Sequence, residues 1–285
     1  MGLDGWRYYN HAAIPTCAPH DVPNLEPIRT GEIWKMAGSP LLARWTSDWD
    51  CGQETSWWYL IKDESFDIAA LKAKRRYEIS KGKKNFEVRR IDPSFFFEQM
   101  FSVTERAFSA WPEKYRPHVD ETSFGELVAA WSGLDVFGAF NRSTGLLSGY
   151  AQLRDRGDYV EFSILRTDPA EERNAINAAL VSGILEYYKD RFDGQFYICD
   201  GEKSVRHETA FQDYLEKYFA FRKAYCRLNV QYRSWVSPIV KVLFPFRGLF
   251  KGKTNTGSQV SGVLKMEEIS RSFCSSQEKN ENLAD

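Results

Sequence analysis

The clearest hydrophobic pattern in the chain runs from residue 159 to residue 191. Residues 159–166 are rich in β-branched, aromatic and aliphatic side chains and lead to Asp168-Pro169, which predicts a strand that ends there. Apolar residues then recur at spacings of three and four, which predicts a helix from Asn174 to about Asp190 with one apolar face. A strand that enters a helix through a polar turn directs free N–H groups towards the strand end, where they can bind phosphate.

Similar signals predict a regular series of elements around this strand and helix. Strands are expected at residues 86–91, 135–140, 146–153, 195–199 and 221–232, and helices at 94–111, 122–131 and 209–218. The turn-forming run at 141–145 joins two of these strands into a hairpin. Residues 86–233 are therefore predicted to form one domain with the order β-α-α-β-β-β-α-β-α-β.

The N-terminal region has a different pattern. Residues 1–65 contain short strand-like runs at 6–9, 33–36, 41–45 and 56–61, which are separated by Pro and Gly and surrounded by aromatic residues. We interpret this region as a small aromatic β-rich lobe. A helix at 66–81, stopped by Gly82, is predicted within a basic linker that covers residues 66–85.

The C-terminal region changes character twice. Residues 234–253 are apolar but are interrupted by Pro238, Pro245 and basic side chains. Two interpretations remain open: residues 235–253 make a peripheral contact with a bilayer surface, or the segment packs on the protein itself. The Ser/Asn/Glu-rich residues 254–285 are predicted to be disordered.

Composition and charge narrow the class of protein. The 285-residue chain has a formal net charge of −1, so no global basic charge argues for nucleic acid. Its five cysteines have no Cys-x-x-Cys spacing, which indicates a reducing cytoplasm and neither a disulfide nor a zinc framework. We see no signal peptide, no run of about twenty apolar residues and no metal spacing among the histidines. The expected location is the cytoplasm, or the inner face of the membrane if the apolar tail lies there.

The turn before the 174–190 helix carries a family resemblance. Residues 173–178 resemble the acyl-CoA pyrophosphate loop of the GNAT acyltransferase superfamily, Arg/Gln-x-x-Gly-x-Gly/Ala, since Arg173 and Ala178 match while Ile176 replaces a glycine. The element order of residues 86–233 is also similar to the GNAT order. The resemblance implies an α/β fold with a mixed central sheet flanked by helices, and acyl-CoA (acetyl-CoA above all) as co-substrate without a metal. The cofactor-binding residues that it implies are Ile164, Leu165, Arg166, Arg173, Asn174, Ala175, Ile176, Asn177 and Ala178.

A second resemblance narrows the branch. In the basic run at 72–84, Arg76, Ile79 and Gly82 match the Arg-x-x-Ile-x-x-(Ala/Gly) helix of FemAB-type transferases, and residues 197–201 and 211–219 are similar to that family as well. A guanidinium binds phosphate through two parallel hydrogen bonds. The resemblance therefore implies that Arg75, Arg76 and Tyr77 bind an anionic substrate or cofactor group. The alternative is that this run is an ordinary solvated helix face.

GNAT chemistry needs a base for the acceptor and an acid for the leaving thiolate. Glu161 on the 159–166 strand is the first candidate base, and Asp200 at the end of the next strand is the second. Tyr214 is the candidate acid that the family resemblance implies. The alternatives are that Glu161 is an exposed strand residue, that Tyr214 is a core residue, and that the acid position falls on Glu216.

These features predict an enzyme that moves an acyl group from acyl-CoA to an amine (or hydroxyl) of a cell-envelope or polysaccharide precursor. The acceptor would be a small molecule or a lipid- or glycan-linked group, as the FemAB resemblance implies. One alternative keeps the fold and uses aminoacyl-tRNA as donor, the only case in which a nucleic acid is expected as partner. A second, favoured by Ile176, is a catalytically inactive GNAT scaffold that binds glycan or protein.

Overall fold

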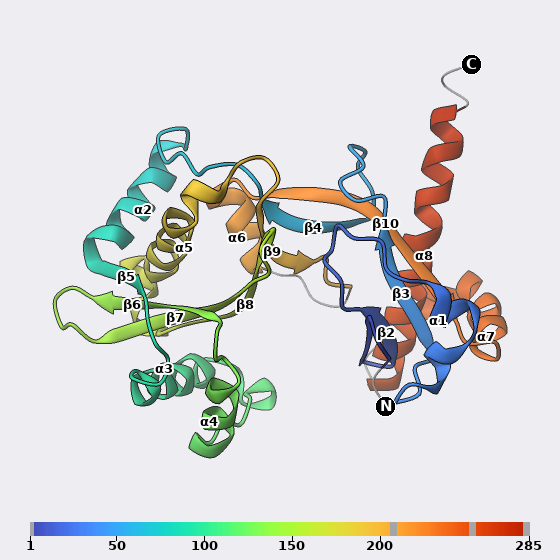
Figure 1. Cartoon of the computed structure of the whole chain (residues 1–285), viewed down its shortest axis with the longest axis horizontal. Helices are drawn as coiled ribbons and strands as arrows, with labels where there is room; N and C mark the ends of the chain where they lie inside the picture. The colour runs from blue at the N-terminus through green and yellow to red at the C-terminus, as the bar shows by residue number, and fades with distance from the viewer. Residues whose placement is uncertain (1–2, 206–209, 251–254, 282–285) are drawn as a thin grey trace. The chain divides into compact units, whose positions relative to one another are not determined.

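The computed structural model describes residues 3–205, 210–250 and 255–281 (Figure 1). Its contacts divide the chain into two compact units. Unit 1 comprises Met1–Tyr59, Glu202–Thr209 and Lys223–Asp285, and unit 2 comprises Leu60–Gly201 and Ala210–Arg222. This division differs from the predicted domain boundaries, since most of the last strand of the predicted 86–233 domain belongs to unit 1.

Unit 2 is built on a mixed sheet. Its strands follow the order β4-β9-β8-β7-β6-β5. Neighbours from β5 to β8 are antiparallel, and β8 and β9 are parallel. The bounds are β4 (Trp57–Lys62), β5 (Phe86–Arg90), β6 (Asp135–Asn141), β7 (Leu147–Asp155), β8 (Tyr159–Thr167) and β9 (Tyr197–Glu202).

Helices cover both faces of this sheet (Figure 1). On one face, Met100 of α3 (Phe97–Ser109) and Phe124 of α4 (Glu121–Ala129) form a core cluster with Val136 and Tyr150 of the strands. The other face carries α2 (Ala73–Asn85), α5 (Ile176–Tyr187) and α6 (Ala210–Phe219). Because β6 and β7 are covered on both sides, they read in the sequence as nearly continuous apolar runs. Short 3₁₀ turns complete the unit at η2 (Glu113–Tyr115), η3 (Pro169–Asn174) and η4 (Lys189–Arg191).

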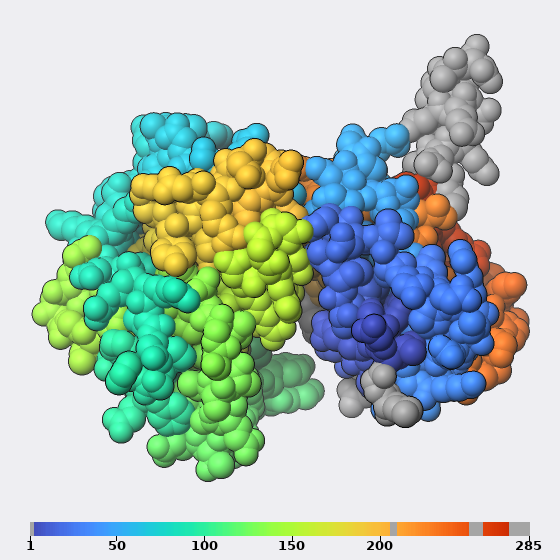
Figure 2. Space-filling model, viewed as in Figure 1, coloured from blue at the N-terminus to red at the C-terminus, as the bar shows by residue number. Residues whose placement is uncertain are grey.

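The hairpin β7–β8 ends at the surface of unit 2. Residues 154–158 are exposed, and this turn forms part of the lime-coloured surface in Figure 2. The helix that should begin at residue 66 begins at Ala73 instead. Before it, the Asp67 carboxylate accepts a hydrogen bond from the Ala69 N–H (2.8 Å), which forms a local turn in place of the first helical residues.

Unit 1 contains β1, β2, β3 and most of β10, in the order β1-β2-β3-β10. The first residues of β4, which enters unit 2 at Leu60, follow β10 in the sheet. The bounds are β1 (Trp6–Tyr9), β2 (Ala12–Pro15), β3 (Leu42–Ser47) and β10 (Arg222–Tyr232), with α1 (Glu26–Arg29), η1 (Glu32–Lys35), α7 (Val236–Leu243), η5 (Phe244–Leu249) and α8 (Asn255–Glu281). The predicted strand at 33–36 is the 3₁₀ helix η1. The reason is tertiary packing: Ile33 is completely buried in a cluster with Trp6 and Ile28.

The C-terminal region also differs from the expectation of disorder. Residues 255–281 form α8, whose Leu264 is buried against Val236 and Val240 of α7. The apolar side chains of α7 and α8 are therefore buried against each other. The sequence pattern alone did not reveal this packing. Residues 251–254, 282–285 and the predicted start of a helix at Thr209 lie outside the described residues. No described helix combines the length and apolar character that a membrane span requires.

Candidate active site

The pairing of strands β8 and β9 ends part-way along both strands. Their parallel register runs from Tyr159 opposite Tyr197 to Glu161 opposite Cys199 and ends there, although both strands continue. The register of β8 with β7 shifts at the same level, because Gln152 faces Ile164 whereas Leu153 faces Phe162. Ser163 is therefore an extra residue, a β-bulge, and such bulges bend a strand. We call this region, β8 after Glu161 and β9 after Cys199, the wedge.

Asp200 is the first residue of β9 within the wedge. Burial raises the pKa of its carboxyl group from the ordinary 3.8 to about 7, while a hydrogen bond with Gln212 of α6 acts in the opposite direction. Gln212 is itself buried. A carboxylate whose pKa lies near neutral pH can both accept and release a proton under physiological conditions, which is the property of a general base.

The structure separates the two candidate bases. The ring of Phe162 lies 6.3 Å from that of Phe211 on α6, so Phe162 and Asp200 face α6. Successive strand residues point to opposite faces, so Glu161 points to the other face of the sheet. The Asp200 carboxyl therefore lies with α6, and that of Glu161 does not.

Tyr214 lies on the same helix as the partner of Asp200. Its hydroxyl group is buried and has no hydrogen-bond partner among the described residues. Burial, and next the carboxylate of Glu78 on α2, raise the pKa of this phenol. The ring packs against Tyr218 at 4.8 Å and Phe219 at 5.7 Å between centroids. The phenol therefore keeps its proton at neutral pH.

Helix α2 brings one of its three predicted binding residues close to α6. The Arg75 guanidinium lies 5.6 Å from the centre of the Tyr218 ring. Arg76 instead donates hydrogen bonds to the carbonyls of Leu71 (2.6 Å) and Ala69 (3.3 Å), which holds the turn before α2. Tyr77 is exposed. Arg75 therefore has a position near α6, whereas Arg76 has a structural role.

The predicted phosphate loop is fixed by its own side chains. Asp168 accepts a hydrogen bond from the Ala170 N–H (3.0 Å) and pairs with Arg106 of α3. The Glu171 carboxylate accepts hydrogen bonds from Asn141 (3.0 Å) and Asn174 (2.5 Å). These acids lie just before the start of α5, where helix N–H groups favour negative charge. The two carboxylates therefore already place negative charge near the N-terminus of α5, where a bound phosphate would otherwise supply it.

Ile176 points into the protein. It is completely buried, and its Cδ1 lies 3.1 Å from the position that a Cβ on Gly149 of β7 would occupy. Its side chain thus fills the space between α5 and the sheet. The residue before it, Ala175, adopts the left-handed conformation (φ 64°).

The remaining residues of the predicted cofactor site differ in exposure. Arg173 is exposed, Asn174 and Asn177 are half-buried, and Ala178 is buried. The Asn177 side-chain oxygen accepts a hydrogen bond from Thr167 (3.1 Å). In the wedge, Ile164, Leu165 and Arg166 are half-buried, and the Arg166 guanidinium lies 5.0 Å from the centre of the Phe108 ring.

Sequence reasoning missed Gln212. This residue lies in the buried stripe of α6 together with Leu215 and Phe219. A polar residue in the apolar phase of a helix is the signal that could have identified it, because such a group must find a buried polar partner. No group of three His, Cys, Asp or Glu side chains in the described part of the chain is arranged to hold a metal ion.

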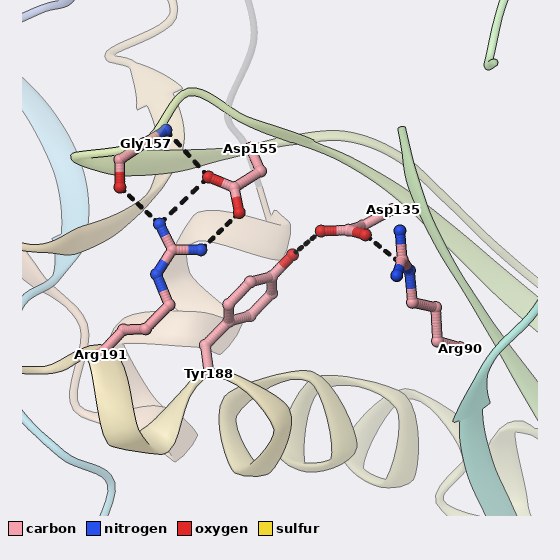
Figure 3. Close-up of polar contacts among 6 residues, drawn as sticks. All are labelled: Arg90, Asp135, Asp155, Gly157, Tyr188 and Arg191. Atoms are coloured by element: carbon pink, nitrogen blue, oxygen red, sulfur yellow. Dashed lines mark hydrogen bonds and ion pairs between the residues drawn. The ribbon is translucent and has the colours of Figure 1, made fainter. Parts of the chain in front are cut away.

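A second polar cluster lies at the other end of α5 (Figure 3). The Tyr188 hydroxyl donates to Asp135 Oδ2 (2.5 Å), and Arg90 Nε lies 2.7 Å from Asp135 Oδ1. Arg191 pairs with Asp155 and donates to the carbonyl of Gly157. We call these residues the paired cluster, since each of these polar side chains has a partner.

Comparison with solved structures defines the fold. The chain is similar to L-PGS from Bacillus licheniformis (12% identity, TM-score 0.54, covering 84% of this chain and 83% of that one). It is also similar to FemX (9% identity, TM-score 0.54, covering 85% and 89%). A third similar structure is the C-terminal domain of a putative lysylphosphatidylglycerol synthetase from Agrobacterium fabrum (11% identity, TM-score 0.50, covering 84% of each chain). The chain has a GNAT-like fold.

This likeness confirms the predicted α/β fold class, with a mixed sheet flanked by helices. The sequence itself matches no family model and no curated protein. At identities of 9–12% the likeness concerns the arrangement of the backbone and carries no residue roles.

Proposed function

We propose that unit 2 transfers an acyl group from an activated donor to an amine, with Asp200 as the general base. The observation that carries this proposal is the carboxyl group of Asp200, whose pKa is raised to about 7 at the point where β8 and β9 separate. The GNAT-like fold supports the class of reaction as an analogy.

The proposed reaction is a direct transfer. The Asp200 carboxylate removes a proton from the attacking ammonium group, and the free amine nitrogen forms a bond with the donor carbonyl carbon. Backbone N–H groups of β8 in the wedge stabilise the oxyanion of the tetrahedral intermediate. The bond to the leaving group then breaks while the buried Tyr214 hydroxyl donates its proton to the departing sulfur or oxygen, and the second proton of the acceptor nitrogen returns to the Tyr214 phenolate. Asp200 afterwards releases its proton to water.

The first candidate donor is acyl-CoA. Its pyrophosphate would meet the first turn of α5, with Arg173 as the exposed cation beside it. Ile176 supports this assignment in one respect, because its side chain points towards β7 and not into solvent. The acceptor that we propose is an amine (or hydroxyl) of a cell-envelope or polysaccharide precursor, carried by a small molecule or by a lipid or glycan.

Aminoacyl-tRNA is the second candidate donor, and the surface of α2 favours it. This helix buries only Ile79 and Gly82. Its cationic side chains at positions 74, 76, 83 and 84 are exposed. The acids at the start of α5 also weaken the case for a pyrophosphate there, and the overall fold resembles that of FemX.

A transfer assay with two variants tests the base. Purified protein is incubated with radiolabelled acetyl-CoA, or with a mixture of radiolabelled aminoacyl-tRNAs, and a panel of amino sugars and amino lipids. We expect transfer by the wild type and a loss of about 10²–10⁴-fold in kcat for Asp200→Asn, with Glu161→Gln near the wild-type rate. A loss confined to Glu161→Gln would assign the base to the opposite face of the sheet. Absence of transfer by the wild type from both donors would contradict the transferase proposal.

Binding measurements distinguish the two donors. Arg173→Ala should weaken acetyl-CoA binding in calorimetry without changing the unfolding transition, if the pyrophosphate meets α5. If tRNA is the donor, its affinity should fall steeply with salt, and Lys83→Gln/Lys84→Gln should reduce the salt slope by about two. Unchanged acetyl-CoA affinity in Arg173→Ala would remove the pyrophosphate assignment.

A further inference from the structure

A large cavity lies within unit 1, apart from the proposed transferase residues of unit 2. Its volume is about 580 Å³, within the range of about 300–1,000 Å³ that small-molecule sites occupy. Much of the wall is apolar and comes from β3, β4, α7 and α8, where the principal side chains are Leu42, Trp57, Val236, Val240, Val263 and Leu264. We call it the α7–α8 cavity.

The rim of this cavity is apolar on the side of α7. Trp235 and Ile239 line the cavity and are nevertheless 54% and 47% exposed. Further along the chain, Val242 (67%), Phe246 and Leu249 are exposed apolar residues as well. An apolar surface that leads into an apolar cavity suits a molecule with a long hydrocarbon part, because each buried methylene group contributes to binding.

The lining of the cavity also includes cationic side chains. The Lys203 side chain lines the cavity and donates a hydrogen bond to the carbonyl of Ser56 (2.9 Å). Its pKa is lowered by burial and then by the nearby cations Lys265 and Lys223. Lys265 is partly neutralised by Glu268 (2.8 Å), and the other cation of the wall, Arg44, is paired with Glu202. Lys265 and Lys223 disfavour the protonated, positively charged form of Lys203. The same positive potential would stabilise an anion bound near Lys203.

We infer that the α7–α8 cavity binds an amphiphile: a hydrocarbon chain between α7 and α8, and an anionic head group beside Lys203. The chain contributes through burial of apolar surface, and the head group through charge and hydrogen bonding. This site does not depend on the transferase proposal, because no residue that we assign a role in the transfer lines the cavity.

Calorimetry with two probes of equal chain length tests the inference on the full-length protein. Dodecanoate should bind at one site with a Kd below about 100 μM, and dodecylammonium at least about tenfold more weakly. Lys203→Gln should remove most of this preference for the anionic probe. Absence of saturable dodecanoate binding, or equal affinity for the two probes, would overturn the inference.

Two variants of α7 provide the matched comparison. Ile239→Asp places a carboxylate at the cavity rim and should weaken dodecanoate binding at least about tenfold, because the charge opposes both the chain and the head group. Val242→Asp makes the same change at an exposed position of the same helix that does not line the cavity, and should leave the affinity within about twofold. Circular dichroism should confirm that both variants are folded. Equal losses would indicate adsorption on the outer surface of α7 and would contradict a cavity site.

A vesicle assay separates the two sources of such an amphiphile. If a membrane lipid fills the cavity, the protein should sediment with phosphatidylcholine vesicles that contain about 30% phosphatidylglycerol, and Ile239→Asp should reduce this binding more than Val242→Asp does. If a free single-chain amphiphile is the natural occupant, dodecanoate should bind while the vesicles do not. Either result supports the cavity site and names its source.

Discussion

The buried polar groups near the two ends of helix α5 in unit 2 differ in whether they have hydrogen-bond or ion-pair partners that stabilise them. At its C-terminal end, Tyr188 and Asp135 form a short hydrogen bond, and Arg90 neutralises the carboxylate (Figure 3). At the end of the sheet where α5 begins, Asp200 has a pKa near 7, and the buried Tyr214 hydroxyl has no partner among the described residues. The contacts among Tyr188, Asp135 and Arg90 stabilise the folded state, whereas the burial of Asp200 and of the Tyr214 hydroxyl destabilises it.

This difference distinguishes polar residues that support the fold from polar residues that serve a functional site. Buried polar groups in folded proteins are paired almost everywhere, because an unpaired one loses its hydrogen bonds to water. Groups that stay unpaired, or that keep a strongly shifted pKa, cluster at sites where a ligand or a proton completes the arrangement. The paired cluster therefore predicts sensitivity of folding to mutation, and the wedge predicts sensitivity of activity.

Removal of the central carboxylates should show the largest contrast. Asp135→Ala leaves the Tyr188 hydroxyl and Arg90 without their shared partner, so the free energy of unfolding should fall by about 3 kcal/mol. Asp200→Asn removes a desolvated acid and should raise that free energy at neutral pH. Urea unfolding followed by circular dichroism measures both. A large loss of stability in Asp200→Asn would mean that this residue belongs to the structural class.

The pH dependence of stability should isolate Asp200. Its pKa is about 7 in the folded protein and 3.8 ordinarily, so between these values the folded state binds more protons than the unfolded state. Stability should therefore fall as the pH rises from about 4 to 7 and level off above 7, by roughly 2–3 kcal/mol after allowance for partial solvent exposure. The difference between the wild type and Asp200→Asn in unfolding experiments across this range gives the effect. A pH-independent difference would contradict the raised pKa.

The two buried tyrosines should give the smallest and most specific contrast. Tyr188→Phe deletes the donor to a buried carboxylate and should reduce the free energy of unfolding by about 2 kcal/mol. Tyr214→Phe deletes a hydroxyl without a partner and should change it by less than about 0.5 kcal/mol or increase it. Thermal unfolding of both single variants provides the measurement. Equal destabilisation would show that the Tyr214 hydroxyl makes an undetected contact that supports the fold.

Much of the architecture could be predicted from the sequence because it depends on local pattern. The strand at 159–166, the hairpin after residue 135 and the alternating strand at 221–232 occur within one to three residues of their predicted bounds. Alternation along 221–232, and apolar runs bounded by turn residues in the other strands, are both local features of the sequence. The predicted order of strands and helices over residues 86–233 also agrees with the structure.

The errors arose where distant contacts decide the local structure. Ile33 is β-branched, yet packing against Trp6 and Ile28 places it in a 3₁₀ turn. The polar sequence after residue 254 suggested disorder, yet Leu264 and Ile269 provide α8 with buried contacts to other segments of unit 1. The local pattern of one sequence shows which residues are apolar, but not which distant residues they pack against in the fold.

The candidate site was only partly visible for the same reason. The sequence identified Asp200 and Tyr214 as candidates, but burial raises the pKa of each, and burial follows from the position of α6. The structure identifies Gln212 as the hydrogen-bond partner of Asp200, which the sequence alone does not reveal. The opposite orientations of Glu161 and Asp200 follow from the register of β8 and β9, which no local signal specified.

Gly82 allows helices α2 and α5 to pack so closely that a movement of one affects the other. A Cβ at this position would lie 2.6 Å from the Ala175 carbonyl oxygen and 2.8 Å from the Ala179 nitrogen, so the two helical backbones touch directly. Backbone atoms cannot rotate aside as a flexible side chain can. A displacement of α2 towards α5, or a larger residue at position 82, must therefore shift the first turn of α5.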